Sequence, residues 1–145
     1  MKIALACDHG GYKLKEFIKP LLEKLGHAYE DFGCNSLESC DYPDFGIPAA
    51  KAVVEGRCDR GIVICTTGIG ISIAANKVRG IRCAHCTDVI QAELTRRHND
   101  ANIMALAAGF TGEYLAERLV ETFLSTDFEG GRHQRRVDKI MAEEA

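Results

Sequence analysis

Residues 61–70 read Gly-Ile-Val-Ile-Cys-Thr-Thr-Gly-Ile-Gly, and this stretch decides how the surrounding chain folds. The apolar run that ends at Cys65 is typical of a short buried strand, and the threonines and glycines after it are typical of a loop. Residues 71–77 then favour a helix. This order places a thiol beside a helix N-terminus, where unpaired N–H groups and the helix dipole favour negative charge.

Segments with the same strand-like composition recur along the chain, and helix-length stretches separate them. Apolar residues repeat at helical spacing in those stretches, most clearly over residues 12–25 and 115–123. Alternating strands and helices predict an α/β fold, a mostly parallel five-stranded sheet with helices on both faces and ligands beyond the carboxyl ends of the strands. We expect one domain over residues 1–145. The predicted strands are residues 2–7, 27–32, 61–65, 81–86 and 103–107.

Glycine and proline mark several boundaries of the predicted helices. Gly26 and Gly56 follow helical patterns and are expected to end them. Pro20 lies inside the first pattern, so that helix is expected to be kinked or interrupted. Thr87, which precedes Asp88, is a plausible N-cap for a later helix.

Composition excludes several classes of function. The formal net charge of −3 gives no broad positive field, so we expect no nucleic-acid partner. No apolar run approaches the roughly 20 residues of a membrane span, and the first apolar run stops at Asp8, too early for a signal peptide. A cytoplasmic protein without a membrane role is expected. Its 7 cysteines, an odd number, favour reduced thiols over a disulfide framework.

Cys65 is either a small core residue, as buried cysteines usually are, or a reactive thiol. Its place at a strand end facing a helix N-terminus favours the thiolate and hence the second interpretation. A cysteine-dependent phosphatase loop would need arginine at position 71, which is Ile71. A dinucleotide fingerprint would need a third glycine at position 73, which is Ile73. Neither alternative is supported.

Other polar residues provide an acid, a base and cations. Asp8 and His9 follow the first strand, although Asp8 is also a plausible helix cap. His98 lies near a helix end, where a solvated position is the alternative. Arg132 and Arg136 are four apart, so they form either a phosphate clamp or a solvated basic face. Together these groups suit proton transfer beside a carbonyl.

A metal site is not predicted. Cys83 and Cys86 have the C-x-x-C spacing, but on a strand their side chains point to opposite faces. No second pair of ligands completes a zinc site, so we expect neither a metal nor a cofactor.

Several long motifs, taken together, closely resemble ribose-5-phosphate isomerase B, within a family that includes galactose-6-phosphate isomerase. The resemblance implies a Rossmann-like three-layer α/β/α sandwich. It also implies an aldose–ketose isomerase, an intramolecular oxidoreductase of the pentose phosphate pathway, that interconverts ribose 5-phosphate and ribulose 5-phosphate through a cis-enediolate without a metal. The motifs are residues 8–11, 41–43, 65–77, 98–102 and 130–136.

The resemblance also implies roles for individual residues. Cys65 is implied to be the base, because residues 71–74 lack the glutamate that serves in another branch of the family. His98 and Thr67 are implied to open the sugar ring, with His98 as the proton donor. The implied substrate contacts are Asp8, His9, Tyr42 and Asn99, with Thr66, Gly68, Ile69 and Gly70 around the enediolate and Arg132 and Arg136 at the phosphate.

Two positions depart from the family pattern. Many relatives have glycine at the position of Thr66 and a phosphate-binding arginine at the position of Gly109. These departures leave three alternatives open: weaker phosphate binding, a different sugar substrate, or compensation by His9 or Arg97. The alternatives are therefore an isomerase of a hexose 6-phosphate, of allose or galactose type, and a non-catalytic sugar-phosphate sensor.

Family members are dimers, often paired into tetramers, and share active sites between subunits. The resemblance thus implies a homodimer or homotetramer in which His98 and Asn99 of one subunit reach Cys65 of another. An isolated monomer would then be inactive.

Overall fold

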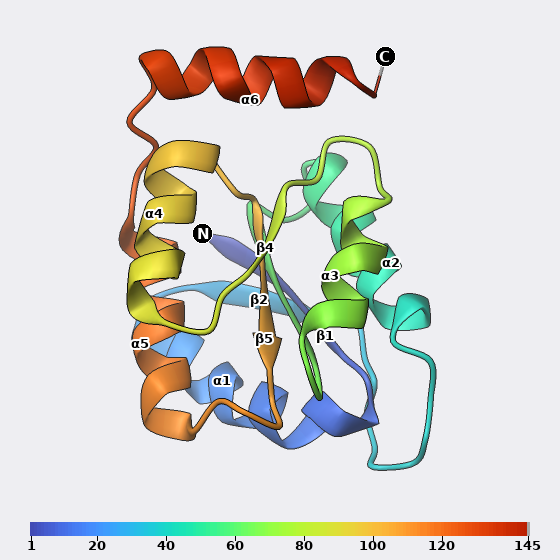
Figure 1. Ribbon diagram of the computed structural model, residues 1–145. Coiled ribbons are helices and arrows are strands. Elements are labelled where there is room, and N and C mark those ends of the chain that lie inside the picture. The colour runs from blue at the N-terminus through green and yellow to red at the C-terminus, as the bar shows by residue number, and fades with distance from the viewer. Residues whose placement is uncertain (145) are drawn as a thin grey trace.

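The computed structural model describes residues 1–144, in which one five-stranded sheet lies between two layers of helices (Figure 1). The strand order is β2-β1-β3-β5-β4, and every pair is parallel. All five predicted strands are present, and the predicted α/β sandwich is confirmed. The strands are β1 (Lys2–Cys7), β2 (Ala28–Asp31), β3 (Arg60–Cys65), β4 (Cys83–His85) and β5 (Ile103–Ala107).

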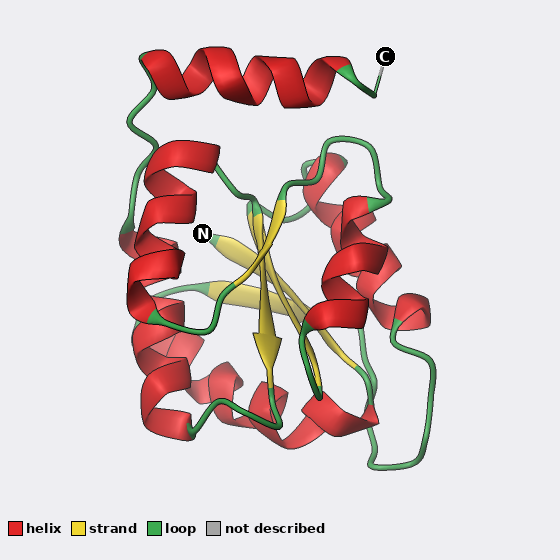
Figure 2. Cartoon of the chain, in the orientation of Figure 1, coloured by secondary structure: helices red, strands yellow, loops and turns green. Residues whose placement is uncertain are grey.

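Helices cover both faces of the sheet (Figures 1 and 2). One layer contains α1 (Tyr12–Lys24), α4 (Val89–Asn99) and α5 (Glu113–Ser125), and the other contains α2 (Pro43–Val54) and α3 (Ile69–Asn76). A short 3₁₀ helix, η1 (His9–Gly11), precedes α1. The last helix, α6 (Arg132–Ala142), packs on α4 and lies beyond the amino ends of the strands. Within residues 1–144, none of the helices has both the length and the apolar character that crossing a bilayer requires.

The strands are apolar along their whole length because both faces of the sheet are buried. Alternate residues of β1 point to opposite sides. Ile3 and Leu5 join the core on the side of α1 and α5, where Phe123 is fully buried. Ala4 and Ala6 join the smaller core on the side of α2 and α3.

The order of the strands creates a crevice between β1 and β3. From β1 the chain passes to β2 on one side and later to β3 on the other, and ligands of open α/β sheets bind outside the carboxyl ends at such a reversal. Cys7 pairs with Ile64, and the Asp8 N–H donates to the Ile64 carbonyl at 3.2 Å. Asp8 and Cys65 therefore flank the crevice.

Two local expectations need correction. Helix α1 runs through Pro20 as one helix, so of the two alternatives expected there, a kink or an interruption, the interruption is wrong. Gly26 follows the end of α1 in the left-handed conformation with φ 84°, as predicted. Asp88, not Thr87, caps α4, because its carboxylate accepts from the Gln91 N–H at 2.8 Å.

A fully buried lysine joins α1 to the end of β2. Lys15 Nζ lies 2.6 Å from Asp31 Oδ1, and Lys19 Nζ lies 2.6 Å from Oδ2 of the same carboxylate. Partial burial opposes ionisation of Asp31, but the two lysines and the Gly33 N–H hold its pKa below the usual value. Asp31 thus compensates a charge that has no access to water.

Asp31→Ala is expected to lower the free energy of unfolding by about 3 kcal/mol, because it leaves the Lys15 ammonium buried without its carboxylate. Urea denaturation of the variant measures this loss. Glu30→Ala, on the same strand, removes only ion pairs with half-exposed Lys2 and Arg57 and should cost less than about 1 kcal/mol. Equal losses in the two variants would contradict the assignment.

Candidate active site

The predicted contact between a thiol and a helix N-terminus is present. Cys65, the last residue of β3, is 4% exposed, and its Sγ accepts a hydrogen bond from the Gly68 N–H at 3.1 Å. Gly68 directly precedes α3 and has φ 74°. The sulfur therefore faces a hydrogen-bond donor at the head of a helix, where the helix dipole favours negative charge. Cys65 is therefore placed to act as a base or a nucleophile.

Two glycines allow aromatic rings to lie directly on this loop. A Cβ at Gly68 would be 2.7 Å from the Nε2 of His85, and a Cβ at Gly70 would be 2.6 Å from the Cζ of Tyr42. Neither ring has room for a side chain beneath it. The His85 Nε2 is buried and has no hydrogen-bond partner among the described residues. The sequence GIG at positions 68–70 is thus needed for close packing as well as for the turn.

The start of α3 presents N–H groups to a cavity at the crevice. The Ile69 N–H donates to the Thr67 Oγ1 at 3.2 Å, whereas the N–H groups of Gly70 and Ile71 have no acceptor within the helix, as is usual for a first turn. The cavity has a volume of about 400 Å³. It is lined by Asp8, Tyr42, Cys65, Thr66, Thr67, Ile69 and Gly70.

Asp8 and His9 have defined partners beside this cavity. The Asp8 Oδ1 accepts from the N–H groups of Gly10 at 2.9 Å and Gly11 at 3.2 Å, so Asp8 is a helix cap as well as a cavity residue. The His9 Nδ1 accepts from the Cys40 N–H at 3.2 Å. Neutral His9 therefore carries its proton on Nε2, where it is free to donate.

Thr66 and Gly109, the two positions expected to depart from the family pattern, are neighbours in space. The Gly109 N–H donates to the Thr66 carbonyl at 2.9 Å, and a Cβ at Gly109 would be 3.0 Å from the Thr66 Cγ2. A Cβ at Gly10 would be 2.1 Å from the Thr66 Oγ1. The Thr66 side chain occupies the space between two glycines, so a residue with a side chain at position 109 would crowd it.

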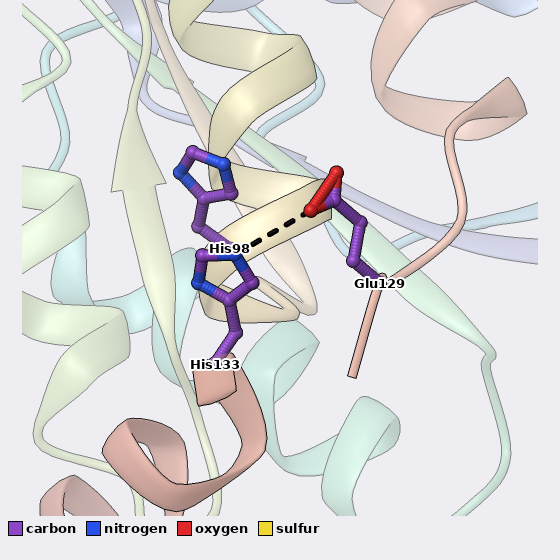
Figure 3. Close-up of side chains that lie close together, drawn as sticks. All are labelled: His98, Glu129 and His133. Atoms are coloured by element: carbon purple, nitrogen blue, oxygen red, sulfur yellow. Dashed lines mark ion pairs between the residues drawn. The ribbon is translucent and has the colours of Figure 1, made fainter. Parts of the chain in front are cut away.

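The predicted ring-opening histidine belongs to a second group of residues. The ring of His98 stacks on that of His133 with centroids 4.3 Å apart, and Glu129 Oε1 lies 3.4 Å from His133 Nε2 (Figure 3). Burial and the neighbouring His98 lower the pKa of His133, which favours its neutral form. We call His98, Glu129 and His133 the His98 cluster.

The described chain does not bring the His98 cluster to Cys65. His98 and Asn99 end α4 and line a different cavity of about 450 Å³, with β4. Arg132 and Arg136 are exposed on α6, beyond the amino ends of the strands, whereas the loop after β3 is at the carboxyl ends (Figure 1). The residues singled out from the sequence thus form two groups at opposite ends of the sheet.

The His98 cluster offers three ligand atoms within 4.8 Å of one another, the donor set of a metal site. However, the planes of the two rings are nearly parallel, with an angle of 12° between them. The lone pairs of the ring nitrogens lie in these planes, so they do not converge on one point. Arg97 also donates to Glu129 at 2.6 Å. Elsewhere, Cys83 and Cys86 pack into the cores on opposite faces of the sheet, as predicted.

The sequence predicts no role for several residues that shape these groups. Glu129 and His133 are four apart at the start of α6, a spacing that could have been noticed. The packing of His85 against Gly68 brings β4 to the loop after β3, although these two strands are not neighbours in the sheet. Nothing in the local sequence indicates it.

A parallel α/β sheet with a cysteine and free helix amides at its crevice is suited to an enzyme that acts on a small anionic molecule. The family model described as Ribose/Galactose Isomerase matches residues 3–140. The chain belongs to this family. The predicted resemblance is confirmed, and with it the prediction of an aldose–ketose isomerase.

Relatives match over nearly the whole chain. Ribose-5-phosphate isomerase B of Escherichia coli is 46% identical over 97% of this chain and 95% of its own. The structure of the Clostridium thermocellum ribose-5-phosphate isomerase B is 56% identical, with a TM-score of 0.98, over 99% of this chain and 97% of that chain. The Mycoplasma genitalium enzyme, solved with bound ribulose-5-phosphate, is 40% identical with a TM-score of 0.95, over 99% of this chain and 95% of that chain.

Gly68→Ala is expected to lower the free energy of unfolding by about 1–3 kcal/mol, because the new Cβ combines positive φ with a clash against His85. Denaturant titration measures the effect. Gly26→Ala is the matched control, since Gly26 also has positive φ, at 84°, but open space around it, so it should lower stability less than Gly68→Ala does. A neutral Gly68→Ala variant would contradict the described packing.

Proposed function

We propose that this chain interconverts ribose 5-phosphate and ribulose 5-phosphate through a cis-enediolate, with Cys65 as the base. The observation that carries the proposal is the Gly68 N–H···Sγ hydrogen bond of 3.1 Å at the crevice of the sheet. The names of the relatives support the substrate, and a homologous structure holds ribulose-5-phosphate.

The thiolate supplies the base that the reaction needs. It removes the proton from C2 of the open-chain aldose, and negative charge develops on the C1 oxygen. The proton of the C2 hydroxyl then passes to the C1 oxygen, and the proton on the sulfur returns to C1 to give the ketose. The N–H groups of Gly70 and Ile71 at the head of α3 have no acceptor within the helix and are available to stabilise that charge, and one such donor is typically worth about 3 kcal/mol. Residues 71–74 contain no carboxylate that could replace the thiol.

Ring opening is assigned to Thr67 and His98. The Thr67 Oγ1 already accepts from the Ile69 N–H, so its own O–H is free to donate to a substrate oxygen. His98 would donate a proton to the ring oxygen of the sugar. Asp8, His9, Tyr42 and Asn99 remain the proposed contacts to the hydroxyl groups and the chain of the sugar.

The two groups of residues at opposite ends of the sheet favour an active site shared between subunits of a homodimer or homotetramer. In this arrangement His98, Asn99, Arg132 and Arg136 of one subunit complete the cavity at Cys65 of another. Exposed apolar side chains flank the short edge strand β4 and offer a surface for a second copy. They are Ile69 and Ile73 on α3 and Ile90 and Leu94 on α4.

A hexose 6-phosphate is the second candidate substrate, and the packing of Thr66 against Gly109 is the observation that favours it. Position 109 offers no cation, so phosphate would depend on Arg132, Arg136 and His9 and could bind at a different distance from Cys65. Comparing kcat/KM for ribose 5-phosphate with those for allose 6-phosphate and galactose 6-phosphate separates the two. A purely sensory role is disfavoured, since Cys65, Thr67 and His98 are all retained.

Cys65→Ser is expected to lower kcat for ribose 5-phosphate by about 10²–10⁴-fold with little change in KM, because a hydroxyl is a far weaker base than a thiolate. The assay is run with a metal chelator, in which the natural protein should remain active. Cys58→Ser, a buried thiol near the amino end of β3, should leave kcat unchanged. Full turnover by Cys65→Ser would refute the assigned base.

Mixing two inactive variants tests whether the site is shared. Cys65→Ala and His98→Asn protomers, unfolded and refolded together, should form mixed dimers in which one of the two sites has both natural residues. Activity near a quarter of the natural level is then expected, because about half of the dimers are mixed and half of their sites are intact. No recovery would place both residues of a site in one subunit.

A further inference from the structure

A second polar cavity lies at the amino ends of the strands, and the proposed reaction uses none of its side chains. It has a volume of about 400 Å³, which suits a small molecule. Arg60 begins β3, Arg82 directly precedes β4 and Asn102 directly precedes β5, so the cavity is at the opposite end of the sheet from Cys65. We call it the Arg60 cavity. The charged and amide side chains that line it are Asp59, Arg60, Arg82, Arg96, Asp100 and Asn102.

Arg96 carries a positive charge that is nearly removed from water. The residue is 5% exposed, and its Nε donates to the Thr126 carbonyl at 3.1 Å. Its Nη1 donates to the Ala101 carbonyl at 2.7 Å and to the Asp100 Oδ1 at 2.8 Å. Asp100 is shared with Arg82, whose Nη2 lies 3.5 Å from the Asp100 Oδ2. One carboxylate therefore compensates two guanidinium groups.

Arg60 adds a third guanidinium group, and among residues 1–144 it forms no ion pair. Its Nη1 donates to the carbonyls of Phe123 at 2.6 Å and Leu124 at 3.3 Å, at the carboxyl end of α5. The guanidinium carbons of Arg60 and Arg96 lie 5.8 and 5.9 Å from the centre of the Phe123 ring. Burial, and after it the charge of Arg96, lower the pKa of Arg60. Two like charges therefore share a partly buried region.

Several donors of these two arginines have no protein acceptor. Nε and Nη2 of Arg60 and Nη2 of Arg96 make no hydrogen bond to a residue that the structure describes, and none of the three nitrogens is sealed from solvent. Guanidinium groups present their donors in a plane that matches the oxygens of a phosphate or a carboxylate. An oxyanion in the cavity would satisfy these donors and compensate the charge.

Asp59 gives the cavity an acceptor beside the cations. Its Oδ2 accepts from the Lys2 N–H at 2.7 Å, and its Oδ1 accepts no hydrogen bond within the described part of the chain. Three aspartates, of which Asp100 has the largest effect and Asp59 the smallest, partly offset the lowered pKa of Arg60. The lining still has three arginines against two aspartates. A ligand with both an anionic group and a hydroxyl donor matches this arrangement, whereas a bare anion leaves the Asp59 Oδ1 without a donor.

We propose that the Arg60 cavity binds a small phosphate monoester that carries hydroxyl groups. The phosphate oxygens accept from the free nitrogens of Arg60 and Arg96, and a hydroxyl group donates to the Asp59 Oδ1. This cavity is separate from the one at Cys65, and the phosphate clamp of the proposed reaction uses other arginines. The site therefore does not depend on whether the chain is an isomerase.

Calorimetric titration of the whole protein with glycerol 3-phosphate tests the site directly. The Arg132→Ala/Arg136→Ala double variant is titrated, because these two arginines form the phosphate clamp of the proposed reaction. One molecule should bind per chain, and adding Arg60→Gln should weaken binding by at least about 10-fold, the effect of losing charge-assisted hydrogen bonds. Arg57→Gln is the matched control, since exposed Arg57 pairs with two glutamates outside the cavity and should leave the affinity unchanged.

Two further variants complete the test. Arg60→Lys retains a positive charge but lacks the planar set of nitrogens, so it should also weaken binding, and it replaces Arg60→Gln if that variant does not fold. Asp59→Ala should weaken the binding of glycerol 3-phosphate relative to that of inorganic phosphate. The site is overturned if the double variant shows no saturable binding, or if a folded Arg60 variant binds as tightly as Arg57→Gln. Inorganic phosphate bound as tightly as glycerol 3-phosphate would overturn the hydroxyl contact.

Discussion

The hydrogen bond from the Gly68 N–H to the Cys65 sulfur is the contact on which the rest of the proposed site depends. It requires β3 to end at Cys65, a turn that only a residue tolerant of positive φ can make, and a helix that starts directly afterwards. Three successive short stretches of sequence meet these conditions: the apolar strand that ends at Cys65, the loop through Gly68, and the helix that begins at Ile69. The chain thereby turns a backbone amide toward a thiol at the end of a buried strand, beside the cavity of the proposed site.

The parallel sheet determines what else can reach that thiol. Asp8 follows β1, which is next to β3, so one chain supplies both residues to the same cavity. Helix α4 runs back along the sheet, which takes His98 to the amino ends of the strands, where α6 holds Arg132 and Arg136. A single copy of this fold has no way to join the two groups. Assembly is therefore part of the proposed chemistry rather than an addition to it.

Much of the fold could be predicted from the sequence because its rules are local. Apolar runs of strand length gave the strands, and Gly26 marked a helix end where the backbone has positive φ. The errors are also local: Thr87 and Asp88 are both good caps, and the carboxylate is the one used. Pro20 costs α1 a hydrogen bond, but packing of its apolar face keeps the helix continuous.

The spatial relations within the site could not be predicted in the same way. The spacing of Cys65 and His98 along the chain says nothing of which end of the sheet each occupies, because that depends on strand order. The contact of Thr66 with Gly10 and Gly109 joins loops after three different strands. The burial of Lys15 against Asp31 likewise depends on the pairing of α1 with β2. Each is a property of the assembled sheet.

In the proposed reaction, this protein moves a proton through an enediolate held beside the Cys65 sulfur. The most direct test is to convert ribose 5-phosphate in deuterium oxide and to examine C1 of the ribulose 5-phosphate formed by nuclear magnetic resonance. Proton transfer through a thiol that exchanges with solvent predicts deuterium at C1. Complete transfer of the original C2 hydrogen to C1, with no deuterium in the product, would indicate a hydride shift and contradict the account.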